Sequence, residues 1–278
     1  MKKIYGVMGD PVEHSMSPEI HNDAFTNHNI NACYHHFQVR RAGLADAVRG
    51  MKAIGVSGFN VTIPHKEAII PLLDEIDEIA LAIGAVNTVV NREGKLIGYN
   101  TDGNGFLQAL TDQYKSPLAG KKILLIGAGG AARGIYFSLV KEGAPNVDIA
   151  NRTREKAEKL VVDCPYPKNS RALSITEAEQ GLGDYDVIIH TTSVGMSPHI
   201  DASPIDISNI KKGAFVSDII YNPLETKFLA EAKSSGADIQ NGVGMFAYQA
   251  ALAFEIWTGI FPDAVRMKEI VLKKLGGI

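Results

Sequence analysis

The chain has few cysteines and no long apolar run, and both scarcities restrict what it can be. Among 278 residues only Cys33 and Cys164 are cysteines, and they form neither a C-x-x-C pair nor a metal-ligand spacing. This excludes a disulfide scaffold and favours a reducing, cytoplasmic environment. No segment approaches the ~18 apolar residues of a membrane helix, and the apolar stretch after Met1–Lys3 is too short for a secretory signal. We expect a cytoplasmic protein without a metal site.

An excess of basic residues is also missing. The chain has 28 Lys and Arg against 31 Asp and Glu, a net charge of −3, and no basic cluster. Nucleic acid is therefore not an expected partner. At ~100–200 residues per domain, the length predicts two domains, each with its own core.

The first part of the chain alternates short β-rich segments with helical patterns, which is typical of an α/β domain. A strand is predicted over 59–63 and helical turns over 67–73 and 79–82. Residues 86–90 and 96–99 predict a hairpin, an antiparallel departure at one edge of the sheet.

A second pattern begins near residue 118, after the turn-forming segment Ser116–Gly120. Strands separated by helical patterns predict a doubly wound, Rossmann-like domain; they are expected at 122–126, 147–150, 172–175, 187–190 and 215–220. Two helices, 245–258 and 264–275, follow without another strand, so we expect them to pack on the first domain. The predicted fold class is α/β, with a discontinuous domain of residues 1–117 and 241–278 around a nucleotide-binding domain of residues 118–240.

A glycine loop follows the strand that ends at Ile126. Residues 127–132, Gly-Ala-Gly-Gly-Ala-Ala, fit the G-x-G-x-x-A pattern of dinucleotide sites, and they stand between a strand and a helix, as that motif requires. The first glycine permits the turn and the second lets the backbone approach a pyrophosphate at the helix N-terminus. We predict that the cofactor contacts Gly127, Ala128, Gly129, Gly130 and Ala131. The alternative is a glycine-rich turn without a ligand.

The next strand ends in Asn151, Arg152 and Thr153, where an NAD-binding domain usually has an acidic residue for the ribose 2′-hydroxyl. A guanidinium instead matches a 2′-phosphate through paired hydrogen bonds. Arg152 therefore favours NADP, whereas Arg154 is interpreted as a solvated charge.

Polar residues gather at two places in the first domain. Ser15 and Ser17 precede a helix and could together hold a carboxylate, although Ser17 could simply cap that helix. Asn60 and Thr62 share one strand face, away from Val61 and Ile63.

Lys66 stands just past that strand, where function concentrates in α/β sheets, and a lysine is disfavoured at a helix start. His65 is interpreted as structural or incidental. Asp102 could be functional or could only cap a helix.

Taken together, these residues resemble the shikimate dehydrogenases. The resemblance extends over nearly the whole chain and rests on motifs in the family's order: Gly9–Pro18, Asn60–Lys66, Gly84–Thr88, Asn100–Gly103, Gly127–Ala132, Asn151–Thr153, Tyr221–Pro223 and Gly242–Gln249. Two departures stand out. His190 replaces the usual Asn, and Lys156 stands where some members have Arg.

The resemblance implies reversible reduction of 3-dehydroshikimate to shikimate by NADPH, in aromatic amino-acid biosynthesis. It implies that Ser15 and Ser17 hold the substrate carboxylate. Residues implied at the ring hydroxyls are Asn60, Thr62, Asn87, Asp102 and Gln249, with Tyr221 nearby. Glu78, Ile219 and Gly242 correspond to positions near the nicotinamide, and Asn151, Arg152, Thr153 and Lys156 to positions at the phosphate.

In this chemistry Lys66 stabilises the developing alkoxide and delivers a proton, and Asp102 orients it. Two alternatives remain: a quinate/shikimate dehydrogenase that tolerates NAD, and a catalytically silent NADP-sensing regulator on the same scaffold. The sequence leaves monomer and homodimer open, and we expect a homodimer.

Overall fold

The chain divides into two compact units in the computed structural model, which describes residues 1–277. The first unit comprises Met1–Thr101 and Gln249–Lys274, and the second comprises Asp102–Tyr248 and the chain end from Leu275. The domain boundaries expected after residues 117 and 240 stay predictions. None of the helices in residues 1–277 has the length and apolar character needed to cross a membrane.

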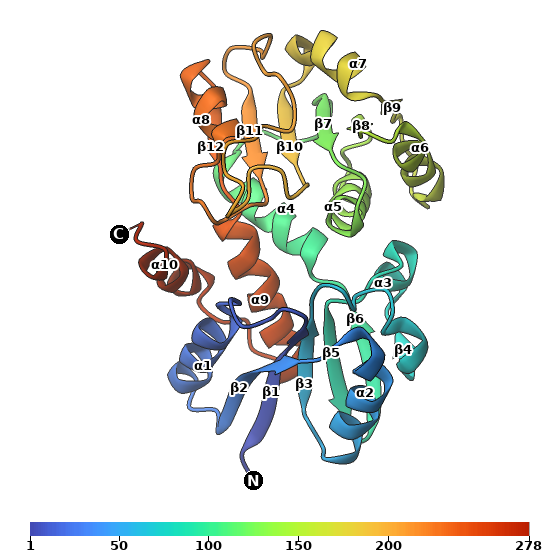
Figure 1. Ribbon diagram of the computed structural model, residues 1–278, viewed down its shortest axis with the longest axis vertical. Coiled ribbons are helices and arrows are strands. Elements are labelled where there is room, and N and C mark those ends of the chain that lie inside the picture. The colour runs from blue at the N-terminus through green and yellow to red at the C-terminus, as the bar shows by residue number, and fades with distance from the viewer. Residues whose placement is uncertain (278) are drawn as a thin grey trace. The chain divides into compact units, whose positions relative to one another are not determined.

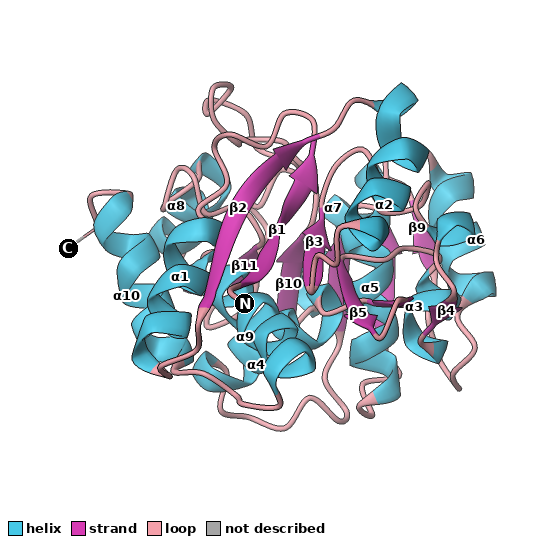
Figure 2. Cartoon of the chain, turned by 90° about the horizontal axis from the view of Figure 1, so that it is seen from below, coloured by secondary structure: helices cyan, strands magenta, loops and turns pink. Residues whose placement is uncertain are grey.

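The first unit is built on a six-stranded mixed sheet with helices (Figures 1 and 2). Its elements are β1 (Lys3–Gly9), α1 (Ser17–Asn27), β2 (Ala32–Gln38), α2 (Leu44–Ala53), β3 (Gly58–Val61), β4 (Glu75–Ile76), α3 (Glu78–Ile83), β5 (Thr88–Arg92), β6 (Lys95–Tyr99), part of α9 (Val243–Thr258) and α10 (Ala264–Lys274). The strand order is β2-β1-β3-β5-β6-β4. The antiparallel hairpin of β5 and β6 is confirmed, but β4 lies beyond it at the edge and pairs parallel with β6.

Apolar side chains pack on both faces of this sheet. One core joins α2 to strand residues such as Met8, Phe59 and Val89, all fully buried. A separate aromatic cluster joins α1 and α9, in which the ring of Phe25 lies 5.1 Å from the rings of both Tyr5 and Phe254. A one-residue slip would move every side chain to the opposite face and into packing formed by other residues, so this packing favours one strand register.

Two local predictions in this unit are wrong. Residues 67–73 form turns and a short 3-10 helix, Ile70–Leu72, instead of an α-helix. Pro71 explains this, because proline lacks the N–H that a helix interior needs. The predicted strand 59–63 ends at Val61, and Ile63 is 72% exposed, so it does not share the buried face of Val61.

The second unit carries a six-stranded sheet in which every strand pair is parallel. Its elements are α4 (Asp102–Gln113), β7 (Ile123–Ile126), α5 (Gly130–Lys141), β8 (Val147–Ala150), α6 (Arg154–Asp163), β9 (Ala172–Leu173), α7 (Ile175–Gln180), β10 (Val187–His190), β11 (Phe215–Asp218), α8 (Lys227–Ser234) and β12 (Asp238–Gln240), with the beginning of α9. The order β9-β8-β7-β10-β11-β12 is that of a doubly wound nucleotide-binding fold, with its switch point between β7 and β10. The predicted Rossmann-like domain is confirmed.

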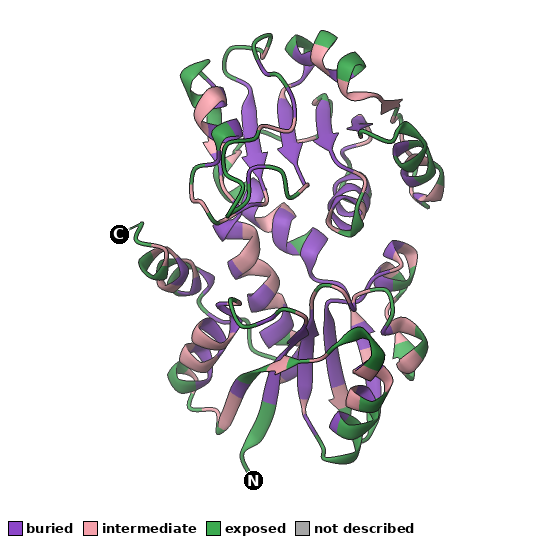
Figure 3. Ribbon diagram, in the orientation of Figure 1, coloured by how far each residue is buried: buried purple, intermediate pink, exposed green. Residues whose placement is uncertain are grey.

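The central strands of this sheet are buried along their whole length (Figure 3). Leu124, Ile188 and Val216 belong to one core, while the alternate residues Ile123 and Ile189 are equally inaccessible on the opposite face. Strands covered on both faces give continuous apolar runs, which is why a buried strand could be predicted at 122–126.

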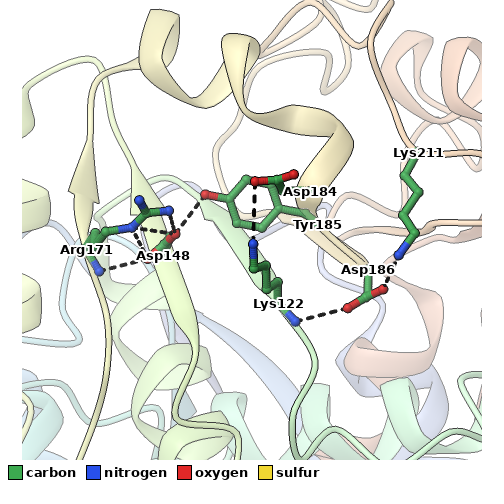
Figure 4. A network of polar contacts seen from close by, with 7 residues as sticks. All are labelled: Lys122, Asp148, Arg171, Asp184, Tyr185, Asp186 and Lys211. Carbon is green, nitrogen blue, oxygen red and sulfur yellow. Dashed lines mark hydrogen bonds and ion pairs between the residues drawn. The ribbon is translucent and has the colours of Figure 1, made fainter.

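A polar network ties the strands together near their amino ends (Figure 4). Asp148 is buried in β8, and its carboxylate accepts hydrogen bonds from Arg171 Nη2 at 2.6 Å and from Tyr185 Oη at 2.8 Å. Asp186, just before β10, accepts from the Lys122 backbone N–H at 3.1 Å and from Lys211 Nζ at 2.6 Å. A buried carboxylate needs such compensation, so these residues stabilise this end of the sheet.

Candidate active site

The glycine loop lies at the switch point of the second unit, where ligands bind in doubly wound sheets. Gly127 has φ +118°, and a Cβ there would lie 2.5 Å from Thr191 Oγ1, so only glycine fits. Gly129 and Gly130 face open space, with nothing within 4 Å of a Cβ. Helix α5 starts at Gly130 without a side-chain cap. Open space beside uncapped N–H groups fits an approaching pyrophosphate.

The segment after β8 contains two arginines, and only Arg154 is bound to neighbouring side chains within residues 1–277. Arg154 is engaged, because its Nε lies 3.1 Å from Glu158 Oε1 and its Nη1 lies 2.9 Å from Glu177 Oε1. Arg152 is exposed and takes part in no hydrogen bond or ion pair among residues 1–277. Lys156 and Thr153 are also exposed, and Asn151 Nδ2 donates to the Thr153 carbonyl at 2.7 Å.

Two residues implied near the nicotinamide lie together in the second unit. A Cβ on Gly242 would stand 2.0 Å from the carbonyl oxygen of Ile219, so the two backbones are in direct contact. The Tyr221 ring packs 5.0 Å from that of Phe246, and burial raises the pKa of the Tyr221 phenol. Glu78, the third implied residue, belongs to the first unit and is the exposed first residue of α3.

Ser15 and Ser17 are paired at the start of α1. The Ser15 hydroxyl donates to Ser17 Oγ at 3.1 Å and accepts from the Ser17 N–H at 3.3 Å. Met16 occupies the N-cap position, and Ser17 is already the first helical residue. The capping interpretation of Ser17 is therefore wrong, and it is Ser15 that satisfies an N–H of the helix.

Asn60 belongs to a continuous chain of polar contacts in the first unit. Its Oδ1 accepts the Tyr34 hydroxyl at 2.7 Å, and its Nδ2 donates to the Asn87 carbonyl and to Thr88 Oγ1, each at 3.1 Å. Asn87 Nδ2 in turn donates to Thr101 Oγ1 at 2.9 Å. Because both Nδ2 hydrogens of Asn60 are used, its carboxamide can meet a ligand only as an acceptor.

Tyr34 connects this chain to the serine pair. Burial raises the pKa of its phenol well above the usual range, against the smaller lowering effect of a hydrogen bond with Ser17. The ring of Tyr34 stacks on His21 at 4.5 Å. Tyr34 was not among the site residues predicted from the sequence, because its place in a β-rich segment was the only signal available.

The remaining predicted residues lie in the turn after β3 and on helices α4 and α9. Lys66 and Thr62 are half-buried, and the Lys66 carbonyl accepts from the Val86 N–H at 2.8 Å. Asp102 begins α4 with only 8% of its surface exposed, so its carboxylate needs hydrogen-bond or charged partners. Gln249 is half-buried on α9. Within residues 1–277, no group of three His, Cys, Asp or Glu side chains could hold a metal ion.

His190, the departure in β10, lies in the second unit and is completely buried. Its Nε2 lies 2.6 Å from Thr192 Oγ1, and its Nδ1 lies 3.1 Å from Asp218 Oδ1 without hydrogen-bond alignment. Asp218 also accepts from the Ile220 N–H and from Thr226 Oγ1. The imidazole thus bridges the segments that leave β10 and β11 at the carboxyl edge of the sheet.

A glycine loop at the switch point of a doubly wound sheet and a free guanidinium after its second strand define a dinucleotide-binding protein. The hydroxyl, carboxamide, lysine and carboxylate groups described above suit a small polyol or hydroxy-acid substrate. The class indicated is a dinucleotide-dependent oxidoreductase.

Comparison with known proteins narrows this class. Three family descriptions match the chain: the shikimate dehydrogenase substrate binding domain over residues 7–89, shikimate / quinate 5-dehydrogenase over 109–220, and the shikimate 5'-dehydrogenase C-terminal domain over 242–272. A shikimate dehydrogenase (NADP(+)) of Bacillus cereus (strain AH820) is 57% identical over 277 residues, covering 100% of both chains. The chain belongs to the shikimate/quinate dehydrogenase family.

Two solved structures show the same fold. Shikimate 5-dehydrogenase from Thermus thermophilus, in complex with NADP(H) and shikimate, has a TM-score of 0.89 and 35% identity, covering 98% of this chain and 99% of that one. Quinate dehydrogenase from Corynebacterium glutamicum, in complex with NAD, has a TM-score of 0.90 and 28% identity. The match covers 98% of this chain and 99% of that one.

Proposed function

We propose that the chain catalyses the reversible NADPH-dependent reduction of 3-dehydroshikimate to shikimate, on the route to chorismate and the aromatic amino acids. The observation that carries the proposal is its full-length similarity to an NADP(+)-dependent shikimate dehydrogenase. The uncommitted guanidinium of Arg152 and the open glycine loop agree with that cofactor.

The residues of the second unit fit the proposed cofactor. The N–H groups of Gly127–Ala131 would hold the pyrophosphate, and Asn151, Arg152, Thr153 and Lys156 would surround the 2′-phosphate. The paired backbones of Ile219 and Gly242 would lie near the nicotinamide, as would Glu78 of the first unit. When bound, the cofactor supplies the hydride.

The first unit would hold the substrate. The hydroxyls of Ser15 and Ser17 are donors, so they would turn to the carboxylate. Asn60, restricted to an acceptor role by its Nδ2 bonds, would take the hydrogen of a ring hydroxyl. The remaining contacts to the ring are proposed for Thr62, Asn87, Asp102 and Gln249, with Tyr221 alongside.

Lys66 is the proposed proton donor. Hydride addition to the ketone carbon leaves an alkoxide, and the ammonium stabilises that charge and then transfers its proton to the oxygen. Asp102, as a hydrogen-bond acceptor, would orient Lys66 and a substrate hydroxyl.

The test is absorbance at the NADPH band with shikimate and NADP, for the wild type and Lys66→Ala. Turnover should fall by about 10²–10⁴ in the variant, the usual scale for a positioned acid or base. Lys95→Ala is the matched control, because that lysine is on the surface of the same unit and binds Glu75 at 2.7 Å. Near-wild-type turnover of Lys66→Ala would refute the assigned role.

Two alternatives stay testable. Turnover of quinate with NAD would favour the broader quinate/shikimate dehydrogenase, although Arg152 stands where an acidic residue would suit NAD. Tight NADP binding without turnover of either substrate would favour a silent regulator. Cytoplasmic location and a homodimer stay predictions, and sedimentation equilibrium would measure the second.

A further inference from the structure

Three backbone hydrogen bonds hold the turn that carries Lys66 to two neighbouring segments, the end of β1 and the residues before β5. The Thr62 N–H donates to the Met8 carbonyl at 2.9 Å, and the Asp10 N–H donates to the Ile63 carbonyl at 3.0 Å. On the other side, the Lys66 carbonyl accepts from the Val86 N–H at 2.8 Å. This turn is therefore a fixed part of the first unit even though β3 has already ended.

His65, next to Lys66, adds a side-chain anchor. Its ring is completely buried, and Nε2 lies 2.6 Å from the carbonyl oxygen of Val39, just after β2. A carbonyl can only accept, so Nε2 is the donor in this hydrogen bond. Nδ1 has no hydrogen-bond partner among residues 1–277. The hydrogen bond of Nε2 to Val39 is thus the one polar contact of this buried ring within residues 1–277.

Val39, the residue that accepts this hydrogen bond, is itself bound to the end of β1. The Val39 N–H donates to the Gly9 carbonyl at 3.0 Å, so one peptide group is fixed by the end of β1 while its neighbouring carbonyl receives His65. The imidazole therefore links the turn after β3 to the ends of two other parallel strands. A hydrophobic ring of the same size would fill the space but would leave the Val39 carbonyl without this donor.

We infer that His65 is a positioning residue for Lys66: through its bond to Val39 it holds the backbone from which the lysine side chain extends. The inference rests on the proposed role of Lys66. Proton transfer requires heavy atoms about 2.6–3.2 Å apart, and a displacement of ~1 Å can cost ~100-fold in rate. Loosening this turn should therefore lower kcat, and should leave the KM for NADP unchanged because His65 lies in the other unit.

Three substitutions separate the hydrogen bond from packing. The carboxamide nitrogen of Gln can replace imidazole Nε2, whereas that of Asn stands at the place of Nδ1 and does not reach Val39. We expect His65→Asn and His65→Phe to lower kcat for shikimate oxidation by about 10- to 100-fold, and His65→Gln to stay within about 3-fold of the wild type. If His65→Phe does not fold, the comparison of kcat between His65→Gln and His65→Asn still tests the inference. Equal kcat values for Gln and Asn would overturn the inference.

A double-mutant cycle tests whether His65 acts through Lys66. In a Lys66→Ala background, His65→Asn should cause no further loss of kcat, because the group it positions is gone. Additive losses would show a general effect on folding and would overturn the inference. Wild-type turnover of shikimate is measured first: its absence would contradict the proposed function, whereas its presence with additive losses contradicts only the role of His65.

Discussion

Replacement of Arg152 by alanine should convert a strong preference for NADP into a weak one. Arg152 is exposed after β8, and the protein gives its guanidinium no partner within residues 1–277. No interaction of the folded chain is therefore lost in the variant. Any effect on the cofactor comes from the missing contact to the 2′-phosphate.

The magnitude follows from the charge-assisted bond. A hydrogen bond to a charged group contributes about 1.5–3 kcal/mol, and ~1.4 kcal/mol corresponds to one decade in affinity. The KM for NADP should therefore rise by roughly 10- to 150-fold. NAD has no phosphate at this position, so its KM should change little. Lys156, a flexible point charge, should retain part of the preference.

The assay is steady-state kinetics with both cofactors, and Arg154→Ala is the matched control. Arg154 lies two residues away and is also an exposed guanidinium, but it is bound to Glu158 and Glu177. Its removal should leave the ratio of NADP to NAD efficiency unchanged. Equal losses for NADP and NAD in Arg152→Ala would mean that this arginine has a structural role, and the phosphate assignment would fail.

Two further predictions concern the cores of the two units. Burial lowers the pKa of His21 from 6.5 to about 3, so between these pH values the unfolded chain binds a proton that the folded chain does not. The free energy of unfolding therefore decreases as the pH is lowered. Relative to His21→Phe, the wild type should lose about 2 kcal/mol on going from pH 8 to pH 5 in urea titrations; parallel losses would contradict the reasoning. Gly127→Ala should lower unfolding free energy by at least ~1–3 kcal/mol, because a Cβ meets Thr191 at positive φ. Gly129→Ala has open space and should weaken only NADP binding in calorimetry, so equal melting losses for both variants would refute this distinction.

The sequence was most informative where one local pattern decides the structure. The apolar run 123–126 followed by glycines predicted both the buried strand and the phosphate loop, because strand burial and glycine conformation are local properties. Two of the short edge strands left no such pattern. β12, with three residues, and β4, with two, are held by pairing with neighbours distant in sequence, and neither was predicted.

The site shows the same division. Single residues such as Ser15, Asn60 and Lys66 could be selected because their types do not suit the positions they occupy. The contacts around these residues could not be predicted, because they join positions far apart in the chain. Tyr34 and Asn60 are separated by 26 positions, and so are His65 and Val39. Such contacts depend on which strands are neighbours, and the local sequence does not specify the sheet order β2-β1-β3.

The polar network of Figure 4 has a consequence for engineering this enzyme. Strand β8 is only four residues long, yet Asp148 within it is fixed by Arg171 and Tyr185, while Arg152 follows just beyond its end. The groups that anchor the strand and the groups proposed to select the cofactor are different side chains. Arg152 and Lys156 can therefore be exchanged without removing a contact of Asp148, and new cofactor preferences can be screened on the same sheet.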